Sequence, residues 1–194
     1  LVSLKMKKEI KKIGKNVIDL QIKALEQLKY SINDSFEKAV KTIIKCKSKI
    51  IICGVGKSGI IASKISATLS SVGTPSFSIS ASDCSHGDLG RITKKDILIL
   101  ISNSGNTSEL NNIIEYSKKN RITLIGIVSN KNSTLYKSSN IKLFIPEVIE
   151  AGYGIVPTSS TTMQLSIGDA LAIALMEKKN FGKLDFKKFH PSGA

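Results

Sequence analysis

The stretch that decides the fold is residues 96–110, DILILISNSGNTSEL. Its first part, Asp96 to Ile101, is almost entirely apolar and predicts a buried strand, and residues 110–119 predict a helix. The turn between them contains Ser, Asn, Gly and Thr, so it offers hydroxyls and free backbone N–H groups at a helix N-terminus. Such a turn suits a dianion such as a phosphate monoester. The alternative is that these residues only turn the chain and cap the helix.

A second loop of the same kind is GVGKSG, residues 54–59, which follows the apolar run 49–53 and precedes a helical pattern. Ligands of open α/β sheets bind at the carboxyl ends of parallel strands, where we expect both loops. The loop matches GxGxxG, but a dinucleotide site also needs an acidic residue ending the next strand, and Asp83 lies beyond it. An NTPase P-loop needs glycine where Ile51 stands. The plain alternative is a tight glycine turn with a solvated lysine.

Strand and helix patterns alternate along the rest of the chain. Apolar runs fall at 49–53, 75–79, 96–101, 123–128 and 141–145, and helical patterns fall at 59–69, 108–119 and 134–138. The runs are continuously apolar rather than alternating, as in strands that are covered on both faces. The pattern therefore predicts an α/β fold, a doubly wound five-stranded parallel sheet flanked by helices.

Both ends of the chain are predicted to be helical. Residues 1–48 form an amphipathic arm, which we treat as part of the same domain as residues 49–194. Asn33 or Asp34 can cap a second helix within this arm. Its apolar stripe must be buried on the main domain or on another subunit, so the arm is a candidate oligomerisation element. A long helix is expected from the Ser/Thr cluster at 158–162 to Lys179, with its apolar stripe in the core.

Composition narrows the class of protein. The net charge of +14 invites a nucleic-acid function, but the basic residues are scattered and aromatic residues make up only 5%, with no Trp. We therefore expect no nucleic-acid partner and a lysine-rich surface that attracts anionic substrates. The three cysteines form no CxxC pair, which fits a reducing cytoplasm. No apolar stretch reaches the ~18–20 residues that span a bilayer, and no signal peptide is evident, so a cytoplasmic location is expected.

Other polar residues are candidates for chemistry. The loop 83–90, DCSHGDLG, lacks metal-ligand spacing, so we predict no metal and treat His86 as a substrate contact or as a residue that orders the loop. Glu150 lies between Pro146 and Pro157, just before the hydroxyl-rich helix start. It is a candidate general base, and the alternative is an exposed loop glutamate. His190, taken alone, is an ordinary surface residue.

Six segments together resemble the sugar isomerase (SIS) domain. They are GVGKSG at 54–59, GTPSF at 73–77, HGDLG at 86–90, ISNSGNTSE at 101–109, PTSSTTMQLSIGDALAIAL at 157–175 and HPSGA at 190–194. Within that group they resemble the arabinose 5-phosphate isomerases of the lipopolysaccharide Kdo pathway. The resemblance implies a flavodoxin-like or Rossmann-like sheet. It also implies interconversion of ribulose 5-phosphate and arabinose 5-phosphate without cofactor or metal, in a homotetramer with sites at subunit contacts.

The resemblance also implies roles for individual residues. The catalytic set falls on Lys57, Glu109, Glu150 and His190, with His190 supplied by a neighbouring subunit. We expect Glu150 to be the base, Glu109 to handle hydroxyl protons or to orient it, Lys57 to stabilise an enediolate and His190 to assist ring opening; the two glutamates can exchange roles. Substrate and phosphate contacts are expected from Gly56, Ser58, His86, Ser102, Asn103, Ser104, Thr107, Ser159, Ser160 and Thr161.

The sequence also departs from the family pattern. Members usually continue into a pair of CBS domains, whereas this sequence stops at Ala194, so we expect an isolated domain or a short form. Ser192 replaces a glycine, and residues 151–156 lack the usual Cys-Pro. The alternatives are another SIS isomerase, acting on 6-phospho-3-hexulose or sedoheptulose 7-phosphate, or a non-catalytic sugar-phosphate sensor. HGDLG and HPSGA argue against the first, and the short segment before residue 49 argues against the second.

Overall fold

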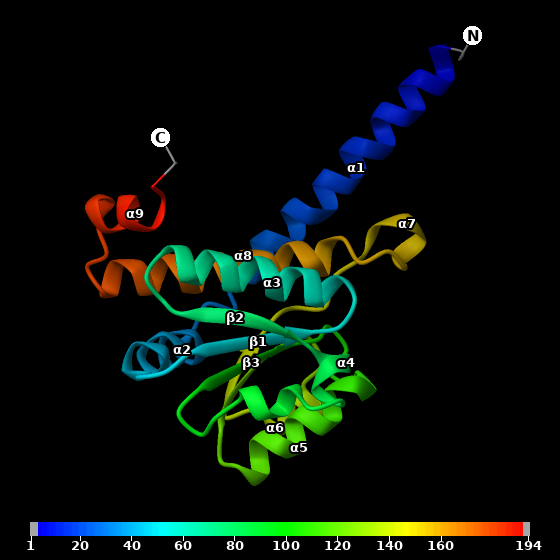
Figure 1. The fold of residues 1–194 in the computed structure, drawn as a ribbon. Coiled ribbons are helices and arrows are strands. Elements are labelled where there is room, and N and C mark those ends of the chain that lie inside the picture. Colours follow the sequence, from blue (N-terminus) through cyan, green and yellow to red (C-terminus); the bar gives the residue numbers. More distant parts are fainter. Residues whose placement is uncertain (1–3, 192–194) are drawn as a thin grey trace.

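The computed structural model describes residues 4–191, so Ser192 lies outside the described residues. Its centre is one parallel sheet of five strands (Figure 1). The strands are β1 (Ile50–Gly54), β2 (Ser76–Ser80), β3 (Ile97–Ile101), β4 (Thr123–Val128) and β5 (Ile141–Phe144). They pair in the order β2-β1-β3-β4-β5, which is the flavodoxin-like order of a doubly wound sheet. The predicted fold class and all five predicted strands are confirmed.

Six helices of residues 4–191 follow the sequence pattern. They are α1 (Leu4–Lys29), α2 (Asp34–Lys45), α3 (Lys57–Ser71), α5 (Asn111–Lys119), α6 (Thr134–Ser138) and α8 (Ser159–Lys178). Five short elements lie in segments for which no helix was predicted or at the edge of a predicted helix: α4 (Ala81–Cys84), η1 (Asp88–Arg91), η2 (Ser108–Leu110), α7 (Ala151–Gly154) and α9 (Lys183–Phe189). Helices of one or two turns are too short to show a clear period of 3.6 residues, so periodicity misses them.

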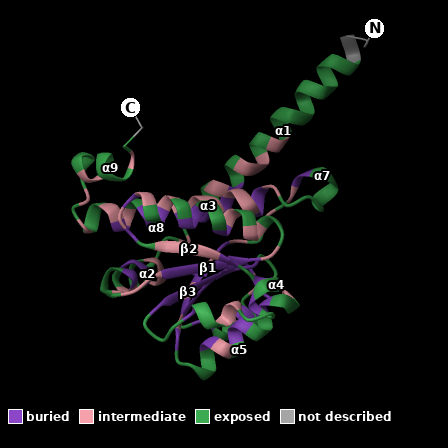
Figure 2. Cartoon of the chain, viewed as in Figure 1, coloured by how far each residue is buried: buried purple, intermediate pink, exposed green. Residues whose placement is uncertain are grey.

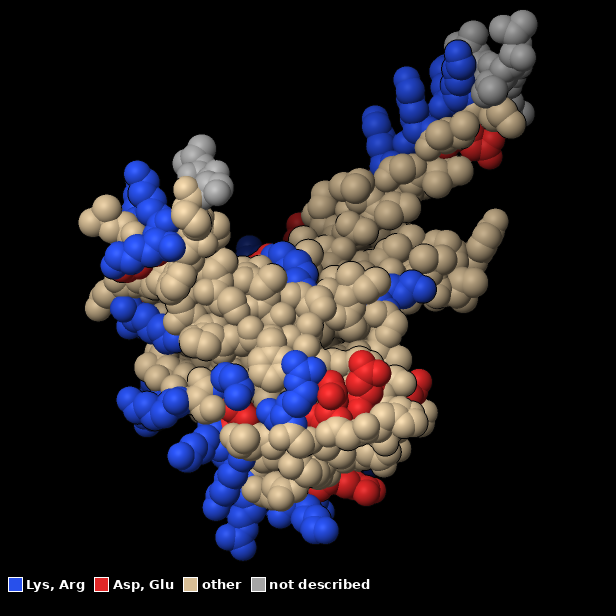
Figure 3. All heavy atoms as spheres, in the orientation of Figure 1, with Lys and Arg blue, Asp and Glu red and all other residues tan. Residues whose placement is uncertain are grey.

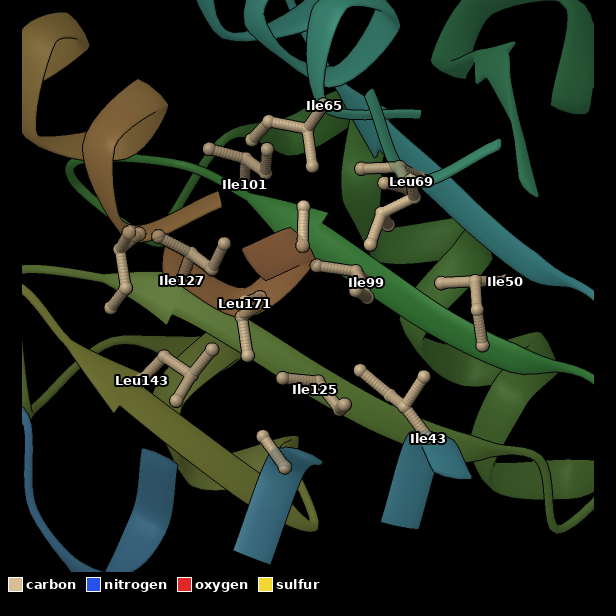
Figure 4. Close-up of a cluster of buried hydrophobic side chains, with 14 of the residues drawn as sticks. Ile43, Ile50, Ile65, Leu69, Ile99, Ile101, Ile125, Ile127, Leu143 and Leu171 are labelled. Carbon is tan, nitrogen blue, oxygen red and sulfur yellow. The ribbon is translucent and has the colours of Figure 1, made fainter. Parts of the chain in front are cut away.

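The sheet separates two hydrophobic cores, because successive strand residues point to opposite faces. Ile50 and Ile52 face the core formed with α1, α2, α3 and α8, whereas Ile51 and Cys53 face the core formed with α4, α5 and α6. Figure 4 shows the first core, where Ile99 and Ile125 of the sheet lie near helical side chains. Burial on both faces explains why the strands read as continuous apolar runs.

Strand order sets the position of the functional loops. The chain leaves β1 toward β2 on one side and returns through β3 on the other, so the sheet has its topological switch point between β1 and β3. The loop 54–59 follows β1 and the loop 102–107 follows β3. The two loops therefore leave adjacent strands at the same edge, which is where ligands of such sheets bind.

The N-terminal arm is only partly packed on the domain. Helix α1 projects from the body, and its outer part is exposed (Figures 1 and 2). Ala24 and Leu28, near its end, are buried, whereas Ile10 and Ile13 are each 59% exposed. Asn33 caps α2, its side chain accepting a hydrogen bond of 2.9 Å from the Ser35 N–H. None of the helices within residues 4–191 is both long enough and apolar enough to cross a membrane.

Candidate active site

A pocket of about 390 Å³ opens where the β1 and β3 loops meet the start of α8. It brings together residues from three segments that are distant in the sequence, the β1 loop, the β3 loop and residues 150–164. Its lining residues are Val55, Lys57, Ser58, Asn103, Glu150, Ile155, Pro157, Ser160, Thr161 and Gln164. Among these described lining residues, Lys57 and Glu150 are the ones that carry a charge. The pocket thus combines one cation, one carboxylate and several hydroxyl and amide groups, and six of its lining residues were predicted for the site.

The β1 loop delivers Lys57 through a glycine turn. Gly56 has a φ of +58° and precedes α3, a conformation that glycine adopts without strain. Helix α3 begins at Lys57, two residues before the predicted start at residue 59, so the lysine lies in the first helical turn. Lys57 is exposed at the pocket. Its neighbour Ser58 donates a hydrogen bond of 3.1 Å to Gln164 Oε1 on α8.

Glu150 caps the N-terminus of α8 from outside the helix. Its Oε2 accepts hydrogen bonds from the N–H groups of Thr158 and Ser159 at 2.8 and 2.7 Å, and its Oε1 accepts one from the Ser160 N–H at 3.2 Å. The Thr158 hydroxyl donates a further bond of 3.1 Å to Oε2. A carboxylate at a helix N-terminus is also favoured by the helix dipole. Glu150 is therefore a fixed anion at the pocket wall rather than a free loop glutamate.

The surroundings of Glu150 act on its pKa in opposite directions. Partial burial raises the pKa, since it disfavours the charged form, while hydrogen bonds from Ser160 and Thr158 lower it. The hydrogen bonds prevail, and the pKa of the Glu150 carboxyl lies below its ordinary value of 4.5. The group is thus ionised at neutral pH and ready to accept a proton, although the same bonds weaken it as a base.

The β3 loop has a rigid internal structure. The hydroxyls of Ser102 and Thr107 lie 2.8 Å apart, and Ser102 Oγ accepts a bond of 3.0 Å from the Gly105 N–H. Gly105 has a φ of +68°, and a Cβ at this position would overlap Ser133. Ser129 donates to the carbonyl oxygen of Asn103 through both its N–H and its hydroxyl. The loop shape is therefore held from within and from the β4 side.

Several backbone N–H groups of this loop remain available, among them those of Ser104 and Thr107. Within residues 4–191, no protein atom accepts a hydrogen bond from the backbone N–H of Ser104 or of Thr107. Ser104 also presents its hydroxyl, which accepts a weak bond of 3.3 Å from the Asn106 N–H. Free N–H groups at the start of a helical segment are typical of sites that bind phosphate oxygens.

The backbone N–H groups at the start of α8, unlike those of the β3 loop, already have a protein acceptor. The N–H groups of residues 158–160 donate to Glu150, and Ser159 Oγ donates to the Ile149 carbonyl oxygen at 2.9 Å. Thr161 Oγ1 donates to the Thr158 carbonyl oxygen at 2.9 Å. Of the predicted phosphate contacts, Ser160 and Thr161 line the pocket and Ser159 precedes them, and most of their donors are already in use.

Eight of the predicted site residues do not line this pocket: Gly56, His86, Ser102, Ser104, Thr107, Glu109, Ser159 and His190. Glu109 is exposed in η2, and its carboxylate accepts a hydrogen bond of 2.8 Å from the Ser108 hydroxyl. The backbone N–H of Glu109 and the Ser108 hydroxyl lower the pKa of this carboxyl. His86 is exposed on the turn after α4. No cluster of three or more His, Cys, Asp or Glu side chains suited to a metal ion occurs among the described residues.

His190 lies at the other end of the molecule. It ends α9, which follows the C-terminus of α8, whereas Glu150 precedes the N-terminus of α8 (Figure 1). Helix α8 has 20 residues and is therefore about 30 Å long. The His190 ring stacks on Phe186, with ring centres 3.7 Å apart, and its Nδ1 lies 2.9 Å from the Phe186 carbonyl oxygen. Within one chain, His190 is remote from the Lys57 pocket.

Sequence reasoning missed Gln164. This residue lies within the apolar pattern of α8, and the pattern was assigned to the core as a whole. Gln164 is 1% exposed and lines the pocket. The available signal was a polar residue at the i+4 position from Ser160, which places it on the same helix face as a predicted site residue.

The surface charge is dispersed. On the face in Figure 3, Lys and Arg side chains lie over separate elements, including α1 and the α9 end, with acidic side chains between some of them. This distribution differs from a single continuous basic stripe. The expectation of no nucleic-acid partner stays a prediction.

Comparison with known proteins places the chain among relatives of one family. A model of the SIS domain family matches residues 42–174. An arabinose 5-phosphate isomerase KdsD of Francisella tularensis is 48% identical over 179 residues, which are 90% of this chain and 55% of that protein. A KdsD of Yersinia pestis is 43% identical, covering 96% of this chain and 57% of that protein. The uncharacterized protein RP505 of Rickettsia prowazekii is 45% identical, covering 93% and 57%. The chain thus spans little more than half the length of these relatives.

Solved structures give the same result. The structure of Escherichia coli CFT073 c3406 in complex with arabinose 5-phosphate matches with a TM-score of 0.91 and 39% identity, over 95% of this chain and 98% of that chain. A putative sugar-phosphate isomerase of Listeria monocytogenes matches with a TM-score of 0.78 and 33% identity, over 91% and 97%. The family model covers well over half of the sequence, including the β1 and β3 loops and most of α8. The chain belongs to the SIS domain family.

Proposed function

We propose that the protein is an aldose–ketose isomerase that interconverts D-arabinose 5-phosphate and D-ribulose 5-phosphate. The observation that carries this proposal is a pocket lined by Lys57, by the fixed carboxylate of Glu150 and by Asn103 of the β3 loop. A cation and a base beside a phosphate-type loop suit proton transfer next to a carbonyl group in a sugar phosphate. Relatives named arabinose 5-phosphate isomerase and a structural neighbour in complex with arabinose 5-phosphate support the same substrate.

The proposed chemistry is a proton transfer between neighbouring carbons. Glu150 removes the proton from C2 of open-chain arabinose 5-phosphate, and the C2–H electron pair forms the C1–C2 double bond while the carbonyl oxygen becomes an enediolate. Lys57 stabilises that developing negative charge. Transfer of a proton between the two oxygens, which we assign to Glu109, and return of a proton to C1 give the ketose. The ionised state of Glu150 at neutral pH supports its role as base.

The phosphate is assigned mainly to the β3 loop. Ser104 and Thr107 have backbone N–H groups that donate to no protein acceptor among residues 4–191, and Asn103 lines the pocket. The hydroxyls of Ser102, Ser160 and Thr161, together with Gly56 and Ser58, complete the proposed contacts. Since Glu150 already occupies the N–H groups at the start of α8, we give that helix start a smaller part in phosphate binding.

We further propose that the enzyme is a homotetramer with sites at subunit contacts. His190 of one chain lies beyond the far end of α8 from its own Lys57, so a neighbouring chain must supply it if it assists ring opening. The outer part of α1 carries Ile10 and Ile13 at 59% exposure, which favours burial against another subunit. Glu109 and His86 are also outside the pocket of one chain and would join it in the assembly.

The proposal extends to the cellular role implied by the family resemblance. Arabinose 5-phosphate would supply the Kdo branch of lipopolysaccharide biosynthesis, in the cytoplasm and without an organic cofactor or metal. The free cysteines Cys46, Cys53 and Cys84 fit that compartment. Partners other than the sugar phosphate and further copies of the chain are not expected.

The test is to incubate the protein with arabinose 5-phosphate in D2O and EDTA and to follow the proton NMR spectrum. We expect ribulose 5-phosphate to appear, with deuterium entering at C1 or C2 through the enediolate. No conversion, while phosphate sugars still bind, would overturn the proposal and direct attention to the hexulose, heptulose and sensor alternatives. A panel of sugar phosphates under the same conditions would then identify the substrate.

A further inference from the structure

We propose that Gln164 is a substrate-positioning and specificity-determining residue, whose carboxamide binds an oxygen of the sugar chain inside the pocket. This inference deepens the proposed function and rests on it for the identity of the sugar. Gln164 is on α8, one turn after Ser160, and it lines the pocket that contains Lys57 and Glu150.

The burial of Gln164 requires an explanation. The side chain is 1% exposed, and its helix neighbours Met163, Ile167 and Leu171 belong to the hydrophobic core. An amide in such surroundings is unfavourable unless its polar atoms are hydrogen-bonded, and a leucine or methionine would pack there at no such penalty. We therefore expect both the oxygen and the nitrogen of the Gln164 carboxamide to have hydrogen-bond partners, in the protein or in a ligand.

One end of the carboxamide joins two parts of the site. Gln164 Oε1 accepts a hydrogen bond of 3.1 Å from Ser58 Oγ, and Ser58 directly follows Lys57 in the first turn of α3. Ser160, on the same face of α8, donates its backbone N–H to Glu150. Gln164 thus links α8, whose N-terminus holds the carboxylate, to α3, which carries the cation.

The other end of the carboxamide has no protein partner. Within the part of the chain that the structure describes, Gln164 Nε2 donates to no protein acceptor. In the same part of the chain, every side-chain nitrogen and oxygen that is fully enclosed does have a hydrogen-bond partner. The nitrogen is therefore not sealed in the core, and its open side is the pocket that Gln164 lines. Because a hydroxyl both donates and accepts, Ser58 can pair with either end, and the carboxamide can present its NH2 or its C=O group.

The chemistry of this group selects the kind of ligand atom. A neutral amide that can donate or accept matches a sugar hydroxyl or carbonyl oxygen, whereas a phosphate dianion is better matched by the free N–H groups of the β3 loop. A site built to hydrogen-bond one hydroxyl discriminates strongly against ligands that lack it, since the buried amide is then left unpaired. Gln164 is expected to orient the polyol chain between Lys57 and Glu150.

The experiment compares Gln164→Met with the wild-type protein. Methionine is nearly isosteric but cannot hydrogen-bond as an amide does. Binding of arabinitol 5-phosphate, which cannot be isomerised, and of inorganic phosphate is measured by calorimetry. We expect the dissociation constant of arabinitol 5-phosphate to rise about tenfold, with inorganic phosphate binding unchanged. In turnover, KM should rise by about the same factor, with kcat changed far less.

Matched controls separate positioning from folding. Gln27→Met makes the same chemical change at an exposed position of α1 and should alter neither ligand. If Gln164→Met does not fold, as judged by its thermal midpoint, Gln164→Ala carries the same prediction because it removes atoms without adding bulk. Unchanged binding of arabinitol 5-phosphate in a folded variant, or an equal loss for both ligands, would overturn the inference.

The proposed function is decided by a different result. It fails if the wild-type protein does not isomerise arabinose 5-phosphate. The Gln164 comparison is then made with the sugar phosphate that the wild-type protein does bind. A loss specific to that sugar over inorganic phosphate supports a positioning role, and equal effects contradict it.

Discussion

The two ends of helix α8 differ in how completely they are built. At its N-terminus, Glu150 accepts hydrogen bonds from three consecutive backbone N–H groups and lies in one pocket with Lys57. At its C-terminal end, α9 carries His190, which is stacked on Phe186 and partly exposed, with no other member of the predicted catalytic set beside it. The pocket at the N-terminal end of α8 contains Lys57 and Glu150, and His190 lies at the C-terminal end, away from that pocket.

Under the proposed function, this difference means that one chain contributes to two different sites, Lys57 and Glu150 to one and His190 to another. A helix about 30 Å long separates the two contributions, and a helix cannot shorten to bring them together. The outer half of α1 carries exposed apolar side chains, Ile10 and Ile13, through which copies can associate. The comparison therefore supports, as part of the proposed function, a site that is completed between subunits.

The largest loss of turnover is expected when either contribution to the shared site, Lys57 or His190, is removed by substitution. Lys57→Ala and His190→Ala should each reduce turnover by at least about 100-fold, since each removes a group that acts in the transition state. Mixing the two inactive variants under conditions of subunit exchange should restore about a quarter of the wild-type sites, because subunits combine at random. Turnover assays before and after mixing measure this recovery.

A matched mixture shows whether the recovery has the expected cause. Lys57→Ala mixed with Glu150→Ala should recover no activity, because both residues line the same pocket of one chain. Failure of the first mixture to recover, with subunit exchange verified by mass spectrometry, would contradict a shared site.

The next effect concerns the two glutamates. Glu150→Gln should destabilise the protein by about 1–2 kcal/mol, because charge-assisted hydrogen bonds to the α8 start are lost. Glu109→Gln is the matched control and should leave the thermal midpoint unchanged, since Glu109 is exposed and its carboxylate accepts a hydrogen bond from its exposed neighbour Ser108 rather than from a helix N-terminus. Thermal unfolding of both variants at pH 7 measures the difference, and equal midpoints would show that the cap contributes nothing.

The same cap makes a prediction about pH. The pKa of Glu150 in the folded protein is below 4.5, its ordinary value, so its stabilisation is complete above that pH and is lost as the pH falls through the folded pKa. The stability gap between the wild-type protein and Glu150→Gln should therefore be constant from pH 7 to about pH 5 and then shrink at lower pH. Asp96, whose pKa is also lowered, is present in both proteins and cancels in the comparison. A gap that widens on acidification would contradict the assignment.

The smallest effect tests the other end of α8. Phe186→Leu removes the ring on which His190 stacks, so it should loosen the histidine and reduce kcat by about threefold, with the thermal midpoint nearly unchanged. Leu184→Ala, on the same helix and 77% exposed, is the control and should have no effect. Equal kcat values for the wild-type protein and Phe186→Leu would show that stacking does not position His190.

The elements that were predicted correctly share one property: their signal is local. Each strand is a continuous apolar run, because both faces of the sheet are covered. The start of α2 was predicted from the capping residues Asn33 and Asp34, and Asn33 does cap the helix. In contrast, α9 and α7 were missed because their existence depends on neighbours rather than on a periodic pattern. Gln164 was missed because its polar role depends on a hydrogen bond with Ser58, which is more than 100 positions away in the sequence.

The roles of Lys57, Glu109 and Glu150 are implied by the family resemblance and stay predictions. The sequence by itself determined the parallel doubly wound sheet and the two loops that follow β1 and β3. These follow from apolar periodicity and from short motifs, which are properties of neighbouring residues. Only the tertiary structure decided that Glu150 is held by the α8 N–H groups, that Gln164 lines the pocket, and that His190 and Lys57 of one chain are separated by the length of α8. These facts depend on distances between segments that are remote in sequence, which local patterns do not encode.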